Sequence, residues 1–218
     1  MRIHFKIQSS NGLIPFNHQH LLTGTIHKWL GSNKEHGQVS LYSFSSLANG
    51  KASKKGLYFE NGTNFFFSSY SDILIKRVID GARKDPFMFH GLDVNEIIIE
   101  EDPDFTSREI FFLASPVLIK RSEGLKTEHI LYNDPRADKL LEDTIRTKMK
   151  EVGLEDDSFT INFISNYPTA KYKLIAYNKI QNKVSICPVI ITGKSQTKRF
   201  IWNVGLGNST GIGFGAIK

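Results

Sequence analysis

Histidines crowd one short stretch of the chain. Four of the seven fall between residues 18 and 36, on and just after the first helix that the sequence predicts. His20 and His27 lie on one helix face with Gly24 between them, at steps of four and three residues. That face is opposite the apolar stripe, so His27 is not expected in the core. His36 follows in the next short loop, which can fold back toward His27.

Two histidines suit general acid–base catalysis, because histidine titrates near neutral pH. RNA cleavage by its own 2′-hydroxyl needs such a pair: one group accepts the 2′-hydroxyl proton and the other protonates the departing 5′-oxygen. A cation stabilises the charge that develops on the phosphoryl oxygens. Nearby lysines in the sequence are Lys28, Lys34, Lys51, Lys54 and Lys55. Solvated histidines with no catalytic role are the alternative interpretation.

The same histidines suit a metal poorly. His20 and His27 are seven residues apart, about 10.5 Å along a helix axis, whereas zinc ligands on a helix are three or four residues apart. Glu35 is the only acidic residue between residues 16 and 50. The single cysteine, Cys187, excludes an internal disulfide and lies in an apolar stretch where its thiol is inert. We therefore expect no metal site and no cofactor.

Composition sets broad limits on the protein class. The chain has 218 residues, 40% of them hydrophobic and 11% aromatic, which allows one large domain or two of about 100 residues. Its formal charge of +6 fits an anionic partner such as nucleic acid, although the excess is small. No apolar run resembles a signal peptide or approaches the length of a membrane span, so we expect a cytoplasmic protein with no membrane contact.

The first hundred residues predict the order strand–helix–strand–strand–helix–strand. Asn17 and Gly31 bound the first helix, and Ser68 or Ser69 begins the second. Tyr70, Ile73, Leu74 and Val78 are expected on the inward face of that second helix. Alternation predicts strands at residues 2–8, 38–45, 57–60, 64–67 and 94–101, the third and fourth of them on either side of an Asn61-Gly62 turn.

The pattern starts again at residue 110. An Asp134-Pro135 signal begins a helix that ends at Val152, and a short helix or turn is expected at residues 195–202. Strands are expected at residues 110–113, 117–120, 159–165, 171–177, 184–192 and 212–217. The sequence therefore predicts an α+β fold of two tandem ferredoxin-like (RRM-like) βαββαβ domains, residues 1–110 and 111–218.

Five glycines lie within residues 205–215, which we call the glycine-rich segment. Glycine permits left-handed backbone and close approach to another molecule, and free N–H groups in such a loop can hold phosphate oxygens. The spacing fits neither a Walker loop nor a dinucleotide fingerprint. It predicts a surface for a phosphate-bearing partner, with a glycine-kinked terminal strand as the alternative.

Both ends of the chain resemble one known family. The segments PFNHQHLLTGTIH (residues 15–27) and GLGNSTGIGFG (residues 205–215) resemble the CRISPR-associated endoribonucleases that process precursor CRISPR RNA, within the repeat-associated mysterious protein superfamily. The resemblance spans the whole chain. It implies metal-independent cleavage within the CRISPR repeat, leaving a 2′,3′-cyclic phosphate or a 3′-phosphate and a 5′-hydroxyl.

The resemblance also implies catalytic residues. The family has a histidine in the loop after the first helix, which matches His36, and a second group near the end of that helix, which matches His27. Some members add a lysine just before the next strand. Here that place is near Gln38 or Ser40, which departs from the pattern. Either a neighbouring lysine takes this role (Lys28, Lys34 or Lys51) or two histidines suffice.

The expected partner is CRISPR repeat RNA, with other CRISPR-associated effector subunits and a second copy of the chain as further candidates. The resemblance implies that part of the glycine-rich segment faces RNA: Gly207, Asn208, Ser209, Thr210 and Gly211. Local basic density adds candidates for phosphate contacts, each also readable as solvated charge: Lys54, Lys55, Arg121, Lys198 and Arg199. The rival function is a non-catalytic subunit that holds CRISPR RNA in an effector complex.

Overall fold

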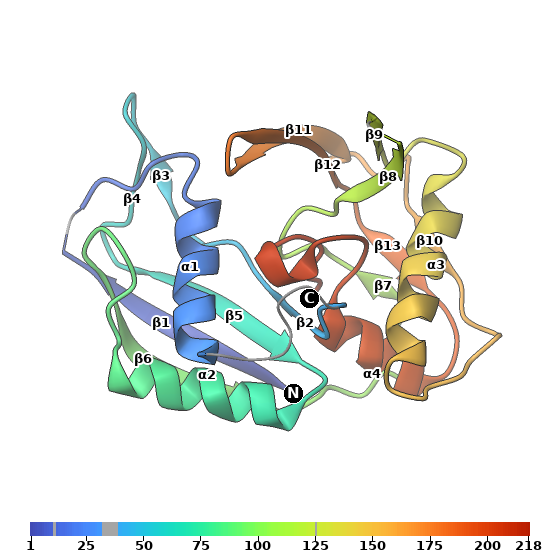
Figure 1. The fold of residues 1–218 in the computed structure, drawn as a ribbon, viewed down its shortest axis with the longest axis horizontal. Helices are drawn as coiled ribbons and strands as arrows, with labels where there is room; N and C mark the ends of the chain where they lie inside the picture. The colour runs from blue at the N-terminus through green and yellow to red at the C-terminus, as the bar shows by residue number, and fades with distance from the viewer. Residues whose placement is uncertain (11, 32–38, 125) are drawn as a thin grey trace.

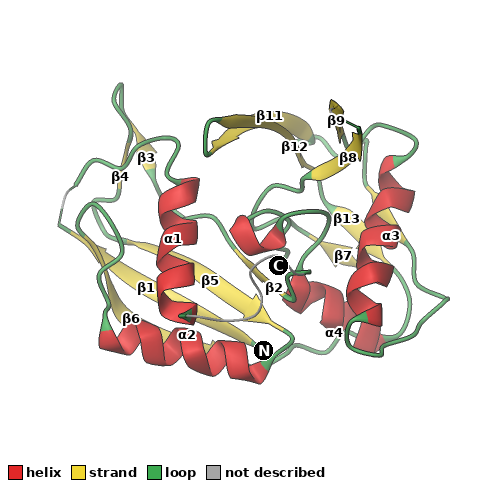
Figure 2. Ribbon diagram, viewed as in Figure 1, coloured by secondary structure: helices red, strands yellow, loops and turns green. Residues whose placement is uncertain are grey.

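Two α+β halves lie side by side in the computed structural model, which describes residues 1–10, 12–31, 39–124 and 126–218 (Figure 1, Figure 2). The first half contains β1 (Arg2–Ser9), α1 (Gln19–Leu30), β2 (Tyr42–Phe44), β3 (Lys51–Ala52), β4 (Leu57–Tyr58), β5 (Thr63–Ser69), α2 (Asp72–Lys84) and β6 (Leu92–Glu100). The second contains β7 (Ile110–Phe111), β8 (Ile119–Glu123), β9 (Lys126–Ile130), α3 (Ala137–Lys150), β10 (Ile161–Phe163), β11 (Lys171–Tyr177), β12 (Ile180–Ile186), β13 (Val189–Ile191), α4 (Ser195–Val204) and the 3₁₀ turn η1 (Thr210–Ile212).

The first half has the ferredoxin-like arrangement that the sequence predicts. Its sheet has the order β2-β5-β1-β6, and β1 pairs antiparallel with both β5 and β6. Both α1 and α2 cover one face of this sheet (Figure 1). Alternate side chains of β1, Ile3, Phe5 and Ile7, are buried in one core with Leu22 and Ile26 of α1. The period-2 and helical patterns therefore identified the correct inward faces.

The second half repeats this arrangement around a smaller sheet. Its order is β10-β13-β7, and Ile217 forms an isolated bridge to Leu113 just beyond β7. The C-terminal residues thus occupy the place of the fourth ferredoxin-like strand. Two hairpins, β8–β9 and β11–β12, are added to this framework. The core of this half is separate from that of the first half.

The second helix begins later than predicted. It starts at Asp72, because Ser68 and Ser69 pair within the sheet with Arg2 and Tyr42 and do not cap the helix.

One expectation that depended on local pattern in this region was wrong. Tyr70 and Ile73 were expected inward but are 36% and 68% exposed, because they lie before and at the outer side of the helix's first turn. The strands predicted on either side of the Asn61-Gly62 turn form as β4 and β5, but they pair with other strands: β4 pairs with β3, and β5 pairs with β1 and β2.

The second half differs from its prediction near the end. Only the end of the strand predicted at residues 212–217 pairs, through the bridge between Ile217 and Leu113. Its beginning is taken by η1, and Gly213 and Gly215 have φ angles of +89° and +72°. The strand predicted at residues 184–192 is divided into β12 and β13 around Pro188, which has no N–H to donate. Residues 117–120 lead into the β8–β9 hairpin instead of joining the main sheet. The division between residues 110 and 111 stays a prediction, and β7 straddles it.

Arg2 ties the two halves together. Its Nε donates to the Ser68 hydroxyl at 2.6 Å and its Nη2 donates to the Ile217 carbonyl at 2.7 Å. The guanidinium also stacks between the rings of Phe66 and Trp202, 3.7 and 3.5 Å from their centroids. Burial lowers the pKa of Arg2 to about 9, which leaves it charged at neutral pH. The halves therefore share a fixed interface, which the glycine-rich segment extends.

Candidate functional site

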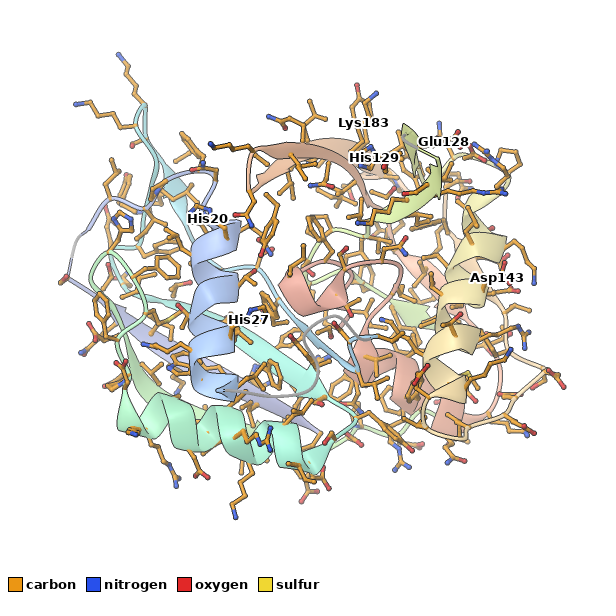
Figure 3. All side chains as sticks on the ribbon, in the orientation of Figure 1. His20, His27, Glu128, His129, Asp143 and Lys183 are labelled. Carbon is orange, nitrogen blue, oxygen red and sulfur yellow. The ribbon has the colours of Figure 1, made fainter. Side chains whose placement is uncertain are left out.

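His27 lies where α1, β2 and the glycine-rich segment meet. The Tyr42 hydroxyl donates to the main-chain oxygen of Gly211 at 3.4 Å, and His27 Nε2 is 3.4 Å from the same hydroxyl oxygen. A phenol has one proton, so this arrangement leaves the Tyr42 oxygen to accept from His27 Nε2–H. Figure 3 shows His27 near the end of α1 and His20 near its beginning. Tyr42 thus orients the His27 ring toward the glycine-rich segment.

The same face of α1 holds the glycine-rich segment directly. Gln19 Nε2 donates to the carbonyls of Ile212 and Gly213 at 2.9 and 3.0 Å, and the Thr23 hydroxyl is 3.3 Å from the Ile212 carbonyl. Gln19, Thr23 and His27 are spaced four residues apart, which places them in one row along the helix. Sequence reasoning missed Gln19 and Thr23, although this regular spacing was a readable signal.

His18, at the N-cap of α1, has different hydrogen bonds and surroundings from His27. His18 Nδ1 donates to the Pro15 carbonyl at 2.9 Å, and burial lowers the pKa of His18, with the positive charge of Lys173 acting in the same direction. His18 is therefore neutral at pH 7. The β11–β12 hairpin, which carries Lys173, reaches toward the beginning of α1 (Figure 1).

The glycine-rich segment is mostly interior. Leu206 N–H donates to the Gly215 carbonyl at 2.8 Å, and Asn208 N–H donates to the Leu118 carbonyl at 2.8 Å, so these donors are used within the chain. A Cβ on Gly213 would lie 1.8 Å from Gln19 Nε2, and one on Gly215 would lie 1.9 Å from the Leu206 carbonyl oxygen. Close packing between the halves therefore accounts for much of the glycine content.

The predicted RNA contacts within the glycine-rich segment differ in their exposure to solvent. Asn208 and Ser209 are half-buried, whereas Gly207, Thr210 and Gly211 are buried. Asn208 Oδ1 already accepts from Lys120 N–H at 2.9 Å, and the Thr210 hydroxyl accepts from Lys148 at 3.1 Å. The side-chain groups that remain for a partner at this surface are therefore mainly the Ser209 hydroxyl and the side-chain Nδ2 of Asn208.

One of the expected phosphate contacts is wrong. Lys198 is 2% exposed, and its Nζ donates to the carbonyls of Thr106 and Arg108 at 3.4 and 3.0 Å. Its ammonium group therefore binds the segment before β7 and does not face solvent, where a phosphate would lie. Arg199, the next residue on α4, is exposed and lies 3.8 Å from Asp102.

The remaining basic candidates lie on two hairpins. Lys54 and Lys55 are exposed at the turn between β3 and β4, and Arg121 is exposed on β8 opposite Glu128 (Figure 3 labels Glu128). The structure does not gather these residues into one cluster with His27.

Comparison with known families identifies the chain. Residues 100–218, more than half of it, match the family model described as "CRISPR associated protein Cas6, C-terminal". The chain belongs to the Cas6 family. This membership supports a role in processing or binding CRISPR RNA.

Solved structures show that the Cas6-type fold extends over the whole chain. One described as "CRISPR associated protein Cas6" is 23% identical, with a TM-score of 0.84, covering 100% of this chain and 98% of that one. A Cas6-related protein from Pyrococcus furiosus is 23% identical, with a TM-score of 0.85 over 100% and 97% of the two chains. "An RAMP protein binding different RNA substrates" is 21% identical, with a TM-score of 0.86 over 100% and 98%. A search of curated protein sequences found no match.

Further observations concern predicted properties of this Cas6-family chain. His36 lies outside the residues that the structure describes. Among those residues, no group of three metal-binding side chains comes together, and no helix is long and apolar enough to cross a membrane. Cys187 is buried, and burial raises the pKa of its thiol to about 11, so it is protonated and unreactive at neutral pH.

Proposed function

We propose that this Cas6-family protein is a metal-independent endoribonuclease that cleaves precursor CRISPR RNA within its repeats. The observation that carries the proposal is the position of His27. It is half-buried, oriented by Tyr42, and placed against the glycine-rich segment between the two halves. A histidine held at an interface of this kind is suited to proton transfer on a bound ligand.

The proposed chemistry is an attack by the 2′-hydroxyl on the adjacent phosphorus. The 2′-oxygen–phosphorus bond forms and the phosphorus–5′-oxygen bond breaks, which gives a 2′,3′-cyclic phosphate and a 5′-hydroxyl. One of His27 and His36 removes the 2′-hydroxyl proton, and the other protonates the departing 5′-oxygen. Both events occur at neutral pH because histidine changes its protonation state there.

RNA would bind across the surface that includes Asn208 and Ser209. Lys54, Lys55, Arg121 and Arg199 would add phosphate contacts, and such contacts make affinity fall steeply as salt rises. Tyr172, on the outer face of β11, is 61% exposed and suited to stack an unpaired base. It was not singled out from the sequence, because a tyrosine in an alternating strand is typical of a packed sheet.

The second candidate function is a non-catalytic CRISPR RNA-binding subunit of an effector complex. One observation favours it: a structural neighbour is described as binding different RNA substrates. Both functions use the same fold and the same glycine-rich segment, so only the activity separates them.

The two functions predict different results when the protein is mixed with a synthetic CRISPR repeat RNA from its own genome in EDTA. The nuclease should cut the repeat at one position, at the same rate as in Mg²⁺, and leave a 5′-hydroxyl product. A repeat of scrambled sequence is the control. Binding without cutting in either buffer would support the non-catalytic subunit, and cutting only in Mg²⁺ would contradict metal independence.

A further inference from the structure

Lys148 on α3 is a buried charge at the base of the glycine-rich segment. It is 5% exposed, and its Nζ donates to three oxygens: the Val204 carbonyl at 3.1 Å, the Gly205 carbonyl at 3.2 Å and the Thr210 hydroxyl at 3.1 Å. An ammonium group has three protons, so these acceptors match its donors one for one. Because each of its protons has an acceptor, the buried ammonium group of Lys148 is held in one position.

The three acceptors lie at both ends of one loop. Val204 is the last residue of α4 and Gly205 its C-cap, so the ammonium also meets the negative end of the α4 dipole. Thr210 begins η1, which continues into Ile212 and Gly213, the residues held by α1. Lys148 therefore closes residues 204–210 into a loop from the side of the second half.

A hollow of about 430 Å³ lies beside this loop, between α3 and the glycine-rich segment. Its lining includes Lys148, Asn208 and Ser209, so the lysine supports the wall that carries the half-exposed residues of the segment. Any change in the loop that Lys148 closes would move that wall and, through Gly211 and Tyr42, the surroundings of His27.

We propose that Lys148 is a positioning residue of the RNA site: it fixes the glycine-rich segment against His27 without touching RNA itself. The consequence for RNA rests on the proposed function, whereas the effect on the segment does not. The segment is thus held from both halves, by Gln19 and Thr23 on one side and by Lys148 on the other.

Protonation of Lys148 gives this tether a pH dependence. Burial lowers the pKa of Lys148 to about 7, and no charged group on α3, α4 or the glycine-rich segment contributes to that change among the described residues. When the segment opens, water reaches the lysine and its pKa returns toward 10.5. Above pH 7 the closed form holds a neutral amine, which still donates two protons to the three acceptors and no longer has the desolvation cost of the charge. The closed form then binds fewer protons than the open form, so raising the pH favours closure, by up to tenfold per pH unit.

The test compares Lys148→Met with Lys150→Met, which removes the same charge from an exposed position two residues along α3. Hydrogen exchange should show at least tenfold faster exchange at the amides of Leu206, Asn208 and Gly215 in K148M and no change in K150M. Single-turnover cleavage with saturating enzyme should fall about tenfold in K148M and stay within twofold in K150M. In the parent, exchange corrected for its intrinsic pH dependence should slow from pH 7 to 8.5, and K148M should lack this slope.

Thr210→Val is a second variant, in case K148M does not fold. It leaves one Lys148 proton without a partner and should speed exchange at the same amides. Exchange in K148M or T210V equal to that in K150M would overturn the proposal, and so would faster exchange with cleavage unchanged. A parent protein that neither binds nor cuts RNA would contradict the proposed function instead, and the exchange arm would still test the tether.

Discussion

Replacing His27 by alanine is expected to slow cleavage of the repeat RNA by about a hundredfold or more, the usual effect of removing a general acid or base. The Tyr42 hydroxyl would lose its contact with His27 but keep its bond to the Gly211 carbonyl, so the fold should be retained. RNA affinity should change by less than about threefold, because the imidazole acts on the transition state more than on the bound RNA. Single-turnover kinetics with saturating enzyme measure the rate separately from binding.

His20→Ala is the matched control for this change. His20 lies on the same helix, and its Nδ1 donates to the Asn17 carbonyl at 2.8 Å, away from the glycine-rich segment. It should cut within about threefold of the parent, whereas His36→Ala should lose as much activity as His27→Ala. If His27→Ala and His36→Ala both cut as fast as the parent, the acid–base assignment is wrong.

Replacing Gly215 by alanine is expected to lower the free energy of unfolding by about 3 kcal/mol or more. The new Cβ would lie 1.9 Å from the Leu206 carbonyl oxygen, and φ at this position is +72°. The backbone of the glycine-rich segment would have to separate, which breaks the Leu206 N–H to Gly215 carbonyl bond. Thermal unfolding should show a midpoint lower by roughly 6–12 °C.

Gly153→Ala separates the two causes of that loss. Gly153 also has a left-handed backbone, with φ of +66°, but no atom lies within 4 Å of the position its Cβ would take. This variant should lose only about 1 kcal/mol, the cost of the backbone conformation alone. Equal losses in the two variants would mean that the close approach at Gly215 does not matter.

The sequence predicted the framework well, because the framework depends on local periodicity. The alternation of Ile3, Phe5 and Ile7 and the stripe of Leu22 and Ile26 each indicated the correct buried face. Two such sets in a repeated order were enough to predict the tandem ferredoxin-like fold. The resemblance of both ends of the chain added the family, which the match over residues 100–218 confirms.

Burial of lysines was not predictable from local charge. Lys198 and Arg199 are neighbours in a basic stretch, but the helix turns one inward, where the partners of Lys198 are carbonyls some ninety residues away. Lys148 shows the same effect. It lies seven and three residues along the helix from the buried positions Leu141 and Ile145, so its place on the apolar face of α3 was readable. Its acceptors on Val204, Gly205 and Thr210 were not.

For the glycine-rich segment, the sequence predicted the backbone conformation but not which molecule packs against it. Its left-handed positions and close approaches were expected, but the approach is largely to the chain itself, at Gln19 and Leu206, rather than to a partner. Sequence gives the conformational freedom of glycine without saying which molecule comes near.

Cleavage of a repeat RNA with a 2′-deoxy nucleotide at the cut site tests the central claim most directly. The modified RNA should bind as tightly as the all-ribose repeat in EDTA but remain uncut, because the attacking oxygen is missing. The all-ribose repeat should be cut in the same buffer. Cutting of the 2′-deoxy RNA at the same position and rate would contradict the account, since another nucleophile would then be responsible.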